Sequence, residues 1–349
     1  MMTTTPRLAA LTAVLAALSV PAHAAEITVV GWGGTWDEAY KEGVWDVFEG
    51  ETDHTIVMEE WAGELAKVRA QVQSGNITYD LVAAEAPSVE IGCAEGLFVP
   101  LSEEITGPAD SYLPGTLHEC GVASDTWATV LAYDKDAVGG TEPTSWADYF
   151  DVEAIPGKRG VLAQAQYTLE NALMGDGVPA DEVYEVLSTP EGVDRAFAKL
   201  DSIRDHIVWW NTTTQAVQNL SSGEVVMTDL YNARVTNEVQ NEGKNWGIAW
   251  EAGFFYGTDM WAVVAGAPNE EAAIELVKWF SEPEHQAGFS RLYAYGTGRR
   301  EAAEFVSAEQ LEHLPSSPAH APHGVEYDTD FWVENKEALE ARFKAWLGQ

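Results

Sequence analysis

A single carboxylate, Asp259, lies within a strongly apolar part of the sequence, the run FFYGTDMWAVVAG. Its neighbours along the chain are aromatic or aliphatic, which is typical of a buried strand. A buried carboxylate either takes up a proton or is neutralised by a partner. We interpret Asp259 as an anchor whose partner comes from outside the protein as a small ammonium compound. A salt bridge to Arg234 within the protein is the alternative interpretation.

The sequence lacks the residue patterns that are typical of enzymes. It contains neither a G-x-S-x-G nucleophile motif nor an H-E-x-x-H zinc motif, and GWGGTW lacks the spacing of a nucleotide-binding loop. His313, His320 and His323 cluster in EHLPSSPAHAPHG, where the prolines favour a surface loop over a metal site. We therefore predict that the protein is not an enzyme, and that it has no catalytic residue, no metal and no cofactor.

The first residues have the pattern of a secretory signal peptide. Arg7 precedes an apolar stretch from Leu8 to Val20, and the small residues Ala22 and Ala24 follow at the positions that a signal peptidase reads. The apolar stretch is short for a membrane span, which needs about 20 residues. We predict a signal peptide at 1–24 and a soluble protein exported to the periplasm. An uncleaved membrane anchor is the alternative.

The charge of the chain is strongly negative. It has 19 basic and 56 acidic residues, and loss of Arg7 with the signal peptide leaves a formal charge of −38. Such a protein repels phosphates, so we exclude nucleic acid as a partner and disfavour anionic membranes. The acidic surface is either an adaptation to high salt or a source of negative potential that concentrates cations near a cleft.

Two cysteines, Cys93 and Cys120, occur in the whole chain. An even number of cysteines in an exported protein favours a disulfide, and a separation of 27 residues permits one. Two unpaired buried thiols are the alternative.

The elements that must position these residues alternate between strand and helix patterns. Short strand patterns occur at 26–32, 55–61 and 79–85, and helical patterns lie between them, the second at 63–75. This βαβαβ order predicts a mostly parallel sheet with helices on its faces. A strand at 224–231, an apolar strand that begins at Asp259 and a helical tail follow. With 349 residues, the chain is long enough for two lobes.

Four segments in this layout resemble the extracellular solute-binding proteins of ABC importers, and the spermidine/putrescine-binding type most of all. The segments are GNITYDLVAAEAPSVEIGCAEGLFVPL, SSGEVVMTDLYNAR, TDMWAVVAGAPNEEAAIELVKWF and AYGTGRREA. The resemblance implies a two-lobed periplasmic-binding-protein fold of type II, in the α/β class, with a ligand held by hinge closure. It also implies a monomer that works with an ABC permease in the inner membrane.

The predicted lobes follow from the same resemblance. We expect lobe 1 at 25–132 and 262–310, and lobe 2 at 133–261. Each lobe should contain a mixed, mostly parallel sheet flanked by helices. We expect 311–349 to be a C-terminal helical segment that packs on the lobes.

The resemblance also implies ligand-binding residues. In polyamine-binding members, aromatic side chains surround the ligand and carboxylates hold its ammonium groups, by cation–π contacts and charge-assisted hydrogen bonds. Asp259 matches the carboxylate, whereas Trp32, Tyr231 and Tyr295 match the aromatic positions. Glu85 follows the third strand, where an acid could hold a second ammonium. Core packing of the aromatics, and a capping or solvent-facing role for Glu85, are the alternatives.

Two departures from the family pattern affect the predicted ligand. Gln164 and Tyr167 stand where an acidic pair is expected, and Arg234 stands where polyamine binders have a small residue. A guanidinium would repel a diamine and bind a carboxylate through two hydrogen bonds. Our first prediction is therefore a small amine such as putrescine or spermidine. The alternative is a zwitterionic γ-amino acid such as GABA, bound by Arg234 and Asp259 together.

Overall fold

The computed structural model describes residues 24–61 and 63–348 of the chain. The predicted signal peptide lies outside these residues, apart from its last residue, Ala24. None of the helices in the described part is long and apolar enough to cross a membrane.

The strands of the described residues join in one sheet with the order β2-β1-β3-β10-β5-β8-β6-β7, to which β11, β4 and β9 add at β10 or β5. The strands are β1 Glu26–Gly31, β2 Thr55–Glu60, β3 Leu81–Glu85, β4 Leu117–His118, β5 Gly121–Asp134, β6 Arg159–Leu162, β7 Ile207–Trp210, β8 Met227–Tyr231, β9 Trp246–Ile248, β10 Phe254–Val263 and β11 Gly324–Glu326.

Helices cover both ends of this sheet. They are α1 Gly34–Tyr40, α2 Asp46–Glu51, α3 Leu65–Ser74, α4 Ala86–Ala94, α5 Glu103–Thr106, α6 Trp146–Phe150, α7 Thr168–Gly175, α8 Val183–Leu187, α9 Pro190–Asp201, α10 Thr213–Ser221, α11 Asn232–Asn241, α12 Glu270–Phe280, α13 Pro283–Ser290, α14 Ala308–Leu311 and α15 Thr329–Leu347. The lengths and positions of β1 to β3 confirm the predicted βαβαβ start.

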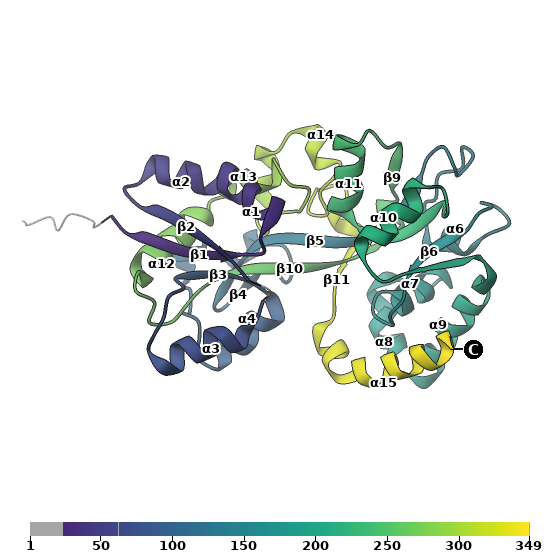
Figure 1. Ribbon diagram of the computed structural model, residues 1–349, viewed down its shortest axis with the longest axis horizontal. Coiled ribbons are helices and arrows are strands. Elements are labelled where there is room, and N and C mark those ends of the chain that lie inside the picture. Colours follow the sequence, from purple (N-terminus) through teal and green to yellow (C-terminus); the bar gives the residue numbers. More distant parts are fainter. Residues whose placement is uncertain (1–23, 62, 349) are drawn as a thin grey trace, which may run out of the picture.

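Two long antiparallel strands, β5 and β10, connect two lobes (Figure 1). In the first lobe, β1 pairs in parallel with both β2 and β3. In the second lobe, β6 pairs in parallel with β7 and β8. The parallel parts are thus joined by antiparallel pairs through β5 and β10 into a single mixed sheet. The predicted lobe boundaries at 132 and 261 fall inside these two strands, and the lobe limits themselves stay a prediction.

Local sequence explains where several elements begin and end. Helix α3 ends at Gly75, whose φ of 70° suits a residue without a Cβ. Capping boxes at Ser145 and Thr212 begin α6 and α10, because each hydroxyl accepts a hydrogen bond from the backbone three residues on. The predicted strand at 224–231 starts later than expected, at Met227. Gly223, just before the predicted start at 224, forms a turn with a φ of 72°, and residues 224–226 lie between this turn and the strand.

The C-terminal helix α15 packs on the second lobe (Figure 1). It buries aromatic and aliphatic side chains in the same core as α7 and α9, namely Phe331, Trp332, Leu339, Phe343 and Trp346. The backbone N–H of Ala165, in the loop before α7, also donates a hydrogen bond to Glu340 of α15. The tail therefore holds the loop that follows β6 in place.

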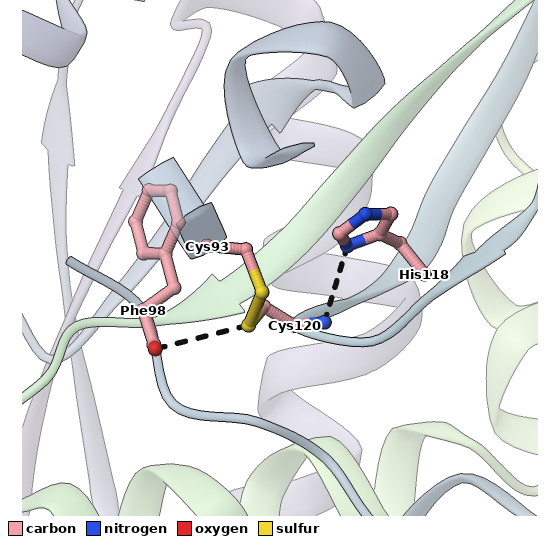
Figure 2. Close-up of a disulfide and its surroundings, with 4 residues drawn as sticks. All are labelled: Cys93, Phe98, His118 and Cys120. Carbon is pink, nitrogen blue, oxygen red and sulfur yellow. Dashed lines mark hydrogen bonds between the residues drawn. A yellow bond between two sulfur atoms is a disulfide. The ribbon is translucent and has the colours of Figure 1, made fainter. Parts of the chain in front are cut away.

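A disulfide joins Cys93 at the end of α4 to Cys120 just before β5 (Figure 2). The Sγ atom of Cys120 lies 3.8 Å from the carbonyl oxygen of Phe98. The backbone N–H of Cys120 donates a hydrogen bond to Nδ1 of His118. The disulfide closes a loop of 27 residues. Of the two alternatives that the sequence left open, the structure contains the bonded form.

Candidate functional site

The eight residues predicted to bind a ligand all line one cavity of about 520 Å³. They are Trp32, Glu85, Gln164, Tyr167, Tyr231, Arg234, Asp259 and Tyr295. The first lobe, the second lobe and strand β10 all contribute, so the cavity lies between the lobes. Folding thus brings together residues that are widely separated in the sequence, and their role in binding stays a prediction.

The ends of parallel strands position four of these eight side chains. Trp32 directly follows β1, and Glu85 is the last residue of β3. Across the cavity, Tyr231 is the last residue of β8, and Gln164 follows β6. Ligands of open α/β sheets bind beyond the carboxyl ends of such strands, because side chains from several loops converge there. The cavity therefore has the location at which this class of fold binds small molecules.

Asp259 lies in β10 with only 7% of its surface exposed. No arginine, lysine or histidine of the described residues forms an ion pair with it, so the salt bridge to Arg234 that the sequence allowed does not form. Burial raises the pKa of this carboxyl well above its ordinary value, and the neighbouring Asp125 and Glu85 raise it further. Side-chain interactions with Trp127 and Trp32 act in the opposite direction. A cation that enters the cavity would therefore meet a buried carboxyl group that lacks a counterion.

Arg234 lies in the first turn of α11, on the wall that the second lobe contributes. Its side chain is exposed, and within the described ranges it forms neither an ion pair nor a side-chain hydrogen bond. Its charge acts to lower the pKa of Tyr293, although burial raises that pKa more. The guanidinium is thus free to bind an anionic group in the cavity.

Aromatic rings line much of the remaining wall. The ring of Trp127 lies edge-on to Tyr231, with centroids 5.6 Å apart, and to Tyr167, with centroids 6.4 Å apart. Trp127 lies against Gly257 of β10, where a Cβ atom would come within 2.1 Å of the indole ring. Glycine is therefore needed at 257 to admit the ring. The result is an apolar wall that suits the methylene groups of a ligand.

Tyr167 has a strained backbone. It is the only residue other than glycine in the described part of the chain with a positive φ, which is 66°. It precedes the first residue of α7, and its side chain is buried. Strained residues of this kind persist where the surrounding structure holds them, often at ligand sites. Tyr167 also lines the cavity between the lobes.

Several cavity residues were not predicted from the sequence. They are Gly33, Gly34, Thr35, Trp36, Trp127, Gln166 and Tyr293. Trp127 was detectable in principle, since Asp125 and Trp127 lie two residues apart in a strand pattern and must share a face. The run GVASDTWATVLAY sets Asp125 between Ser124 and Thr126 in an otherwise largely apolar strand. Trp36 and Tyr293 carry no such local signal, because loops and helix starts bring them to the cavity.

A second chamber of about 290 Å³ adjoins the cavity. The two share Glu85, Trp127, Gln166 and Tyr167. The far wall of the chamber comes from the start of α15 and includes Lys336. The space between the lobes therefore continues from Asp259 toward the C-terminal helix.

Comparisons with known proteins fit this geometry. Residues 44–319 match a family described as bacterial extracellular solute-binding protein. A γ-aminobutyric acid-binding protein of Pseudomonas aeruginosa is 40% identical over 333 residues, which cover 95% of this chain and 94% of that protein. A spermidine/putrescine-binding periplasmic protein of Haemophilus influenzae is 23% identical over 288 residues. The matched residues make up 80% of this chain and 78% of that protein. The predicted polyamine type is thus matched only distantly.

Solved structures give the same result. The crystal structure of an ABC transporter substrate-binding protein from Bradyrhizobium japonicum has a TM-score of 0.78 at 30% identity, covering 93% of this chain and 99% of that one. A structure of a GABA receptor has a TM-score of 0.75 at 27% identity, covering 92% and 97%. This likeness confirms the predicted two-lobed fold. The matched proteins are binding proteins of transporters, which confirms the prediction that this chain is not an enzyme.

Proposed function

Because the chain belongs to the family of bacterial extracellular solute-binding proteins, we propose that it captures a zwitterionic γ-amino acid such as GABA for an ABC importer. One observation carries this proposal above the others. A guanidinium and a buried carboxylate line the same cavity without forming an ion pair with each other. Opposite charges held apart in this way are complementary to a ligand that carries both charges.

Arg234 would bind the ligand carboxylate. Its planar guanidinium can donate two parallel hydrogen bonds to the two oxygens, a geometry that lysine does not reproduce. The position of Arg234 on the second lobe matters as well. A carboxylate bound there would hold the ligand against one wall of the cavity.

Asp259 would bind the ligand ammonium from the opposite direction. It belongs to β10, which crosses between the lobes, and it lies beside Trp32 of the first lobe. The ammonium would accept no hydrogen bonds and donate three, so an unpaired carboxylate is the partner it requires. The methylene chain between the two charged ends would lie against the aromatic rings of Trp127 and Tyr231.

A ligand that contacts both lobes stabilises the closed conformation of the cleft. A ligand that touches Arg234 on one side and Trp32 on the other stabilises the arrangement in which both walls are near. A permease that recognises the closed shape would then accept loaded protein. We propose a periplasmic location and delivery to such a permease in the inner membrane.

A polyamine is the competing ligand. Glu85 lies next to Asp259 at the cavity and would suit a second ammonium, and a distant relative is named for spermidine and putrescine. Arg234 argues against it, because a guanidinium in the cavity repels a dication. The charges of the cavity and the greater identity to the GABA-binding relative both favour the γ-amino acid.

Calorimetric titration with GABA, putrescine and spermidine at pH 7.5 tests the proposal. We expect GABA to bind more tightly than either polyamine. Arg234→Ala should weaken GABA binding by about 10- to 150-fold, the loss of a charged hydrogen bond. The same variant should bind putrescine as well as the unchanged protein does, or better. Arg300→Ala, which removes an exposed guanidinium from another cavity, is the matched control.

The outcomes separate the two ligand classes. Binding of putrescine or spermidine without binding of GABA would establish the polyamine alternative. Failure of all three ligands would show that the amine assignment is wrong. Equal GABA affinity in the Arg234→Ala variant would remove Arg234 from the site.

A further inference from the structure

Three carboxylates lie side by side across neighbouring strands. Asp259 of β10 is directly opposite Glu85 in the β3–β10 ladder and directly opposite Asp125 in the β10–β5 ladder. Residues that are directly opposite in antiparallel strands project from the same face and lie close together, so like charges there repel. The fold thus sets acids next to the proposed ammonium site on both sides.

Asp125 is hidden behind the cavity and does not line it. Its side chain is fully buried. Oδ2 accepts a hydrogen bond from Nε1 of Trp36 at 3.0 Å and from Oγ of Ser124 at 3.3 Å. Among the described residues, Oδ1 has no hydrogen-bond partner. Trp36 itself lines the cavity, so Asp125 is connected to the cavity wall through one hydrogen bond.

Neither acid of the buried pair has a counterion in the part of the chain that the structure describes. Two adjacent buried carboxylates without cations cannot both ionise cheaply, and such pairs hold a proton. Burial raises the pKa of Asp125 to about 7, and that of Asp259 also lies well above its ordinary value.

The tyrosines around the pair do not take this proton. The groups that face it are Tyr40 from α1, Glu85 from β3, Tyr231 from β8, Tyr293 and Tyr295 from the loop after α13, and Arg234 from α11. Burial raises the pKa values of the four tyrosines above 10, so they stay neutral between pH 5.5 and 7.5. Arginine stays charged throughout that range.

We propose that Asp125 is a positioning residue of the binding site, which shares a proton with Asp259 in the free protein and loses it when a ligand ammonium binds. The carboxyl O–H bond of the pair breaks, and the proton leaves to the buffer. The ammonium keeps its own protons and donates an N–H to the carboxylate that results. The inference rests on the proposed function, because it requires an ammonium group at Asp259.

The shared proton reduces the repulsion between Asp125 and Asp259 in the free protein. With one proton on the pair, the protein is spared two adjacent buried anions. A neutral isostere of the ligand cannot replace the proton, so the pair favours cationic groups. Proton release also makes the affinity depend on pH. With one proton released, affinity falls about tenfold for each pH unit below the range in which the pair titrates.

Calorimetry of GABA binding at pH 6.0, in buffers with different ionisation enthalpies, measures the protons released. We expect a release of more than about half a proton per GABA bound. We also expect GABA affinity to weaken by about tenfold or more from pH 7.5 to 5.5. Asp125→Asn keeps the hydrogen-bond acceptor for Trp36 but removes the partner charge. In that variant Asp259 is freed from the repulsion of Asp125, so its pKa should fall, and GABA affinity should change less between pH 7.5 and 5.5 than in the unchanged protein.

Asp110→Asn, an exposed aspartate changed in the same way, is the matched control and should behave like the unchanged protein. GABA binding without proton release would overturn the inference and leave the proposed function intact. Equal proton release in the Asp125→Asn variant would also overturn it. Absence of GABA binding at every pH would refute the proposed function, and the ligand-driven release with it.

An infrared spectrum of the free protein tests the shared proton without any ligand or affinity. At pH 6.0, the difference between the unchanged protein and Asp125→Asn should contain a protonated-carboxyl band, because other buried acids cancel. The Asp110→Asn difference should contain none. A difference spectrum without that band for Asp125→Asn would show that Asp125 does not share a proton with Asp259, and would overturn the inference.

Discussion

Replacement of Asp259 by asparagine should have opposite effects on binding and on stability. Asparagine has nearly the same shape as aspartate and can still accept a hydrogen bond, but it carries no charge. We expect the variant to bind GABA weakly and to be at least as stable as the unchanged protein. Replacement of a residue that only supports the fold would lower the stability of the protein instead.

The size of each effect follows from the surroundings of Asp259. A hydrogen bond to a charged group contributes about 1.5 to 3 kcal/mol, so its loss should weaken GABA binding by about 10- to 150-fold. In the free protein, Asp259 lies beside Asp125 and Glu85 and lacks an ion-pair partner among the described residues. Removal of one acid from this row relieves repulsion, so the unfolding temperature should stay the same or rise.

Titration calorimetry at pH 7.5 measures the affinity, and differential scanning calorimetry of the free protein measures the unfolding temperature. Asp110→Asn is the control for both, since it makes the same chemical change in an exposed 3₁₀ turn. A thermal shift on adding GABA gives a second measure of affinity, because a ligand that binds only the folded state stabilises it.

Two results would refute the reasoning. GABA affinity within about threefold of the unchanged protein would show that Asp259 does not hold the ammonium. A clear fall in unfolding temperature would show that the charged carboxylate stabilises the free fold, contrary to the row of acids that the strands set together.

Two further predictions concern stability. Burial raises the pKa of Glu170 from its ordinary value of 4.5 to about 8. Between these values the folded protein keeps a proton that the unfolded chain gives up, so stability falls as pH rises from 4.5 to about 8. Glu170→Gln, which can still accept the hydrogen bond from Trp332, should flatten this fall and gain about 1 to 3 kcal/mol at pH 8.5 in urea unfolding; an unchanged pH profile would contradict the assignment. Cys93→Ser with Cys120→Ser opens a loop of 27 residues and should cost about 2 to 4 kcal/mol in the same assay. GABA affinity should stay within about twofold of the unchanged protein. A variant that loses GABA affinity but keeps its stability would show that the role of the disulfide is not purely structural.

The residues at the ends of strands were predictable from the sequence. A strand pattern fixes where a strand ends, and in α/β proteins the side chains just beyond those ends meet at the ligand site. Trp32, Glu85 and Tyr231 were recognised in this way, together with the resemblance to a family. The departure at Arg234 was visible as a charged residue in an unexpected place, and it already indicated a zwitterion as the alternative ligand.

The relation of these side chains to one another was not predictable in the same way. Period-two alternation tells which residues share a face, but a shift of one residue in the pairing would move every side chain to the other face. The sequence therefore left open whether Asp259 would bind Arg234, and it gave no reason to place Asp125 beside it. Asp125 and Asp259 are neighbours only through the pairing of β5 with β10, and their separation in the chain hides this from local patterns.

The sequence alone determined the alternation of strands and helices, because this depends on local patterns. The resemblance of its motifs to a family indicated the two-lobed class and eight of the residues that line the cavity. Tertiary structure decided that β5 and β10 lie side by side in one sheet, which sets Asp125, Asp259 and Glu85 in a row. It also decided that Arg234 stands apart from Asp259. The physical reason is that strand pairing is a long-range choice, made by the packing of whole lobes, and charges become neighbours only after that choice.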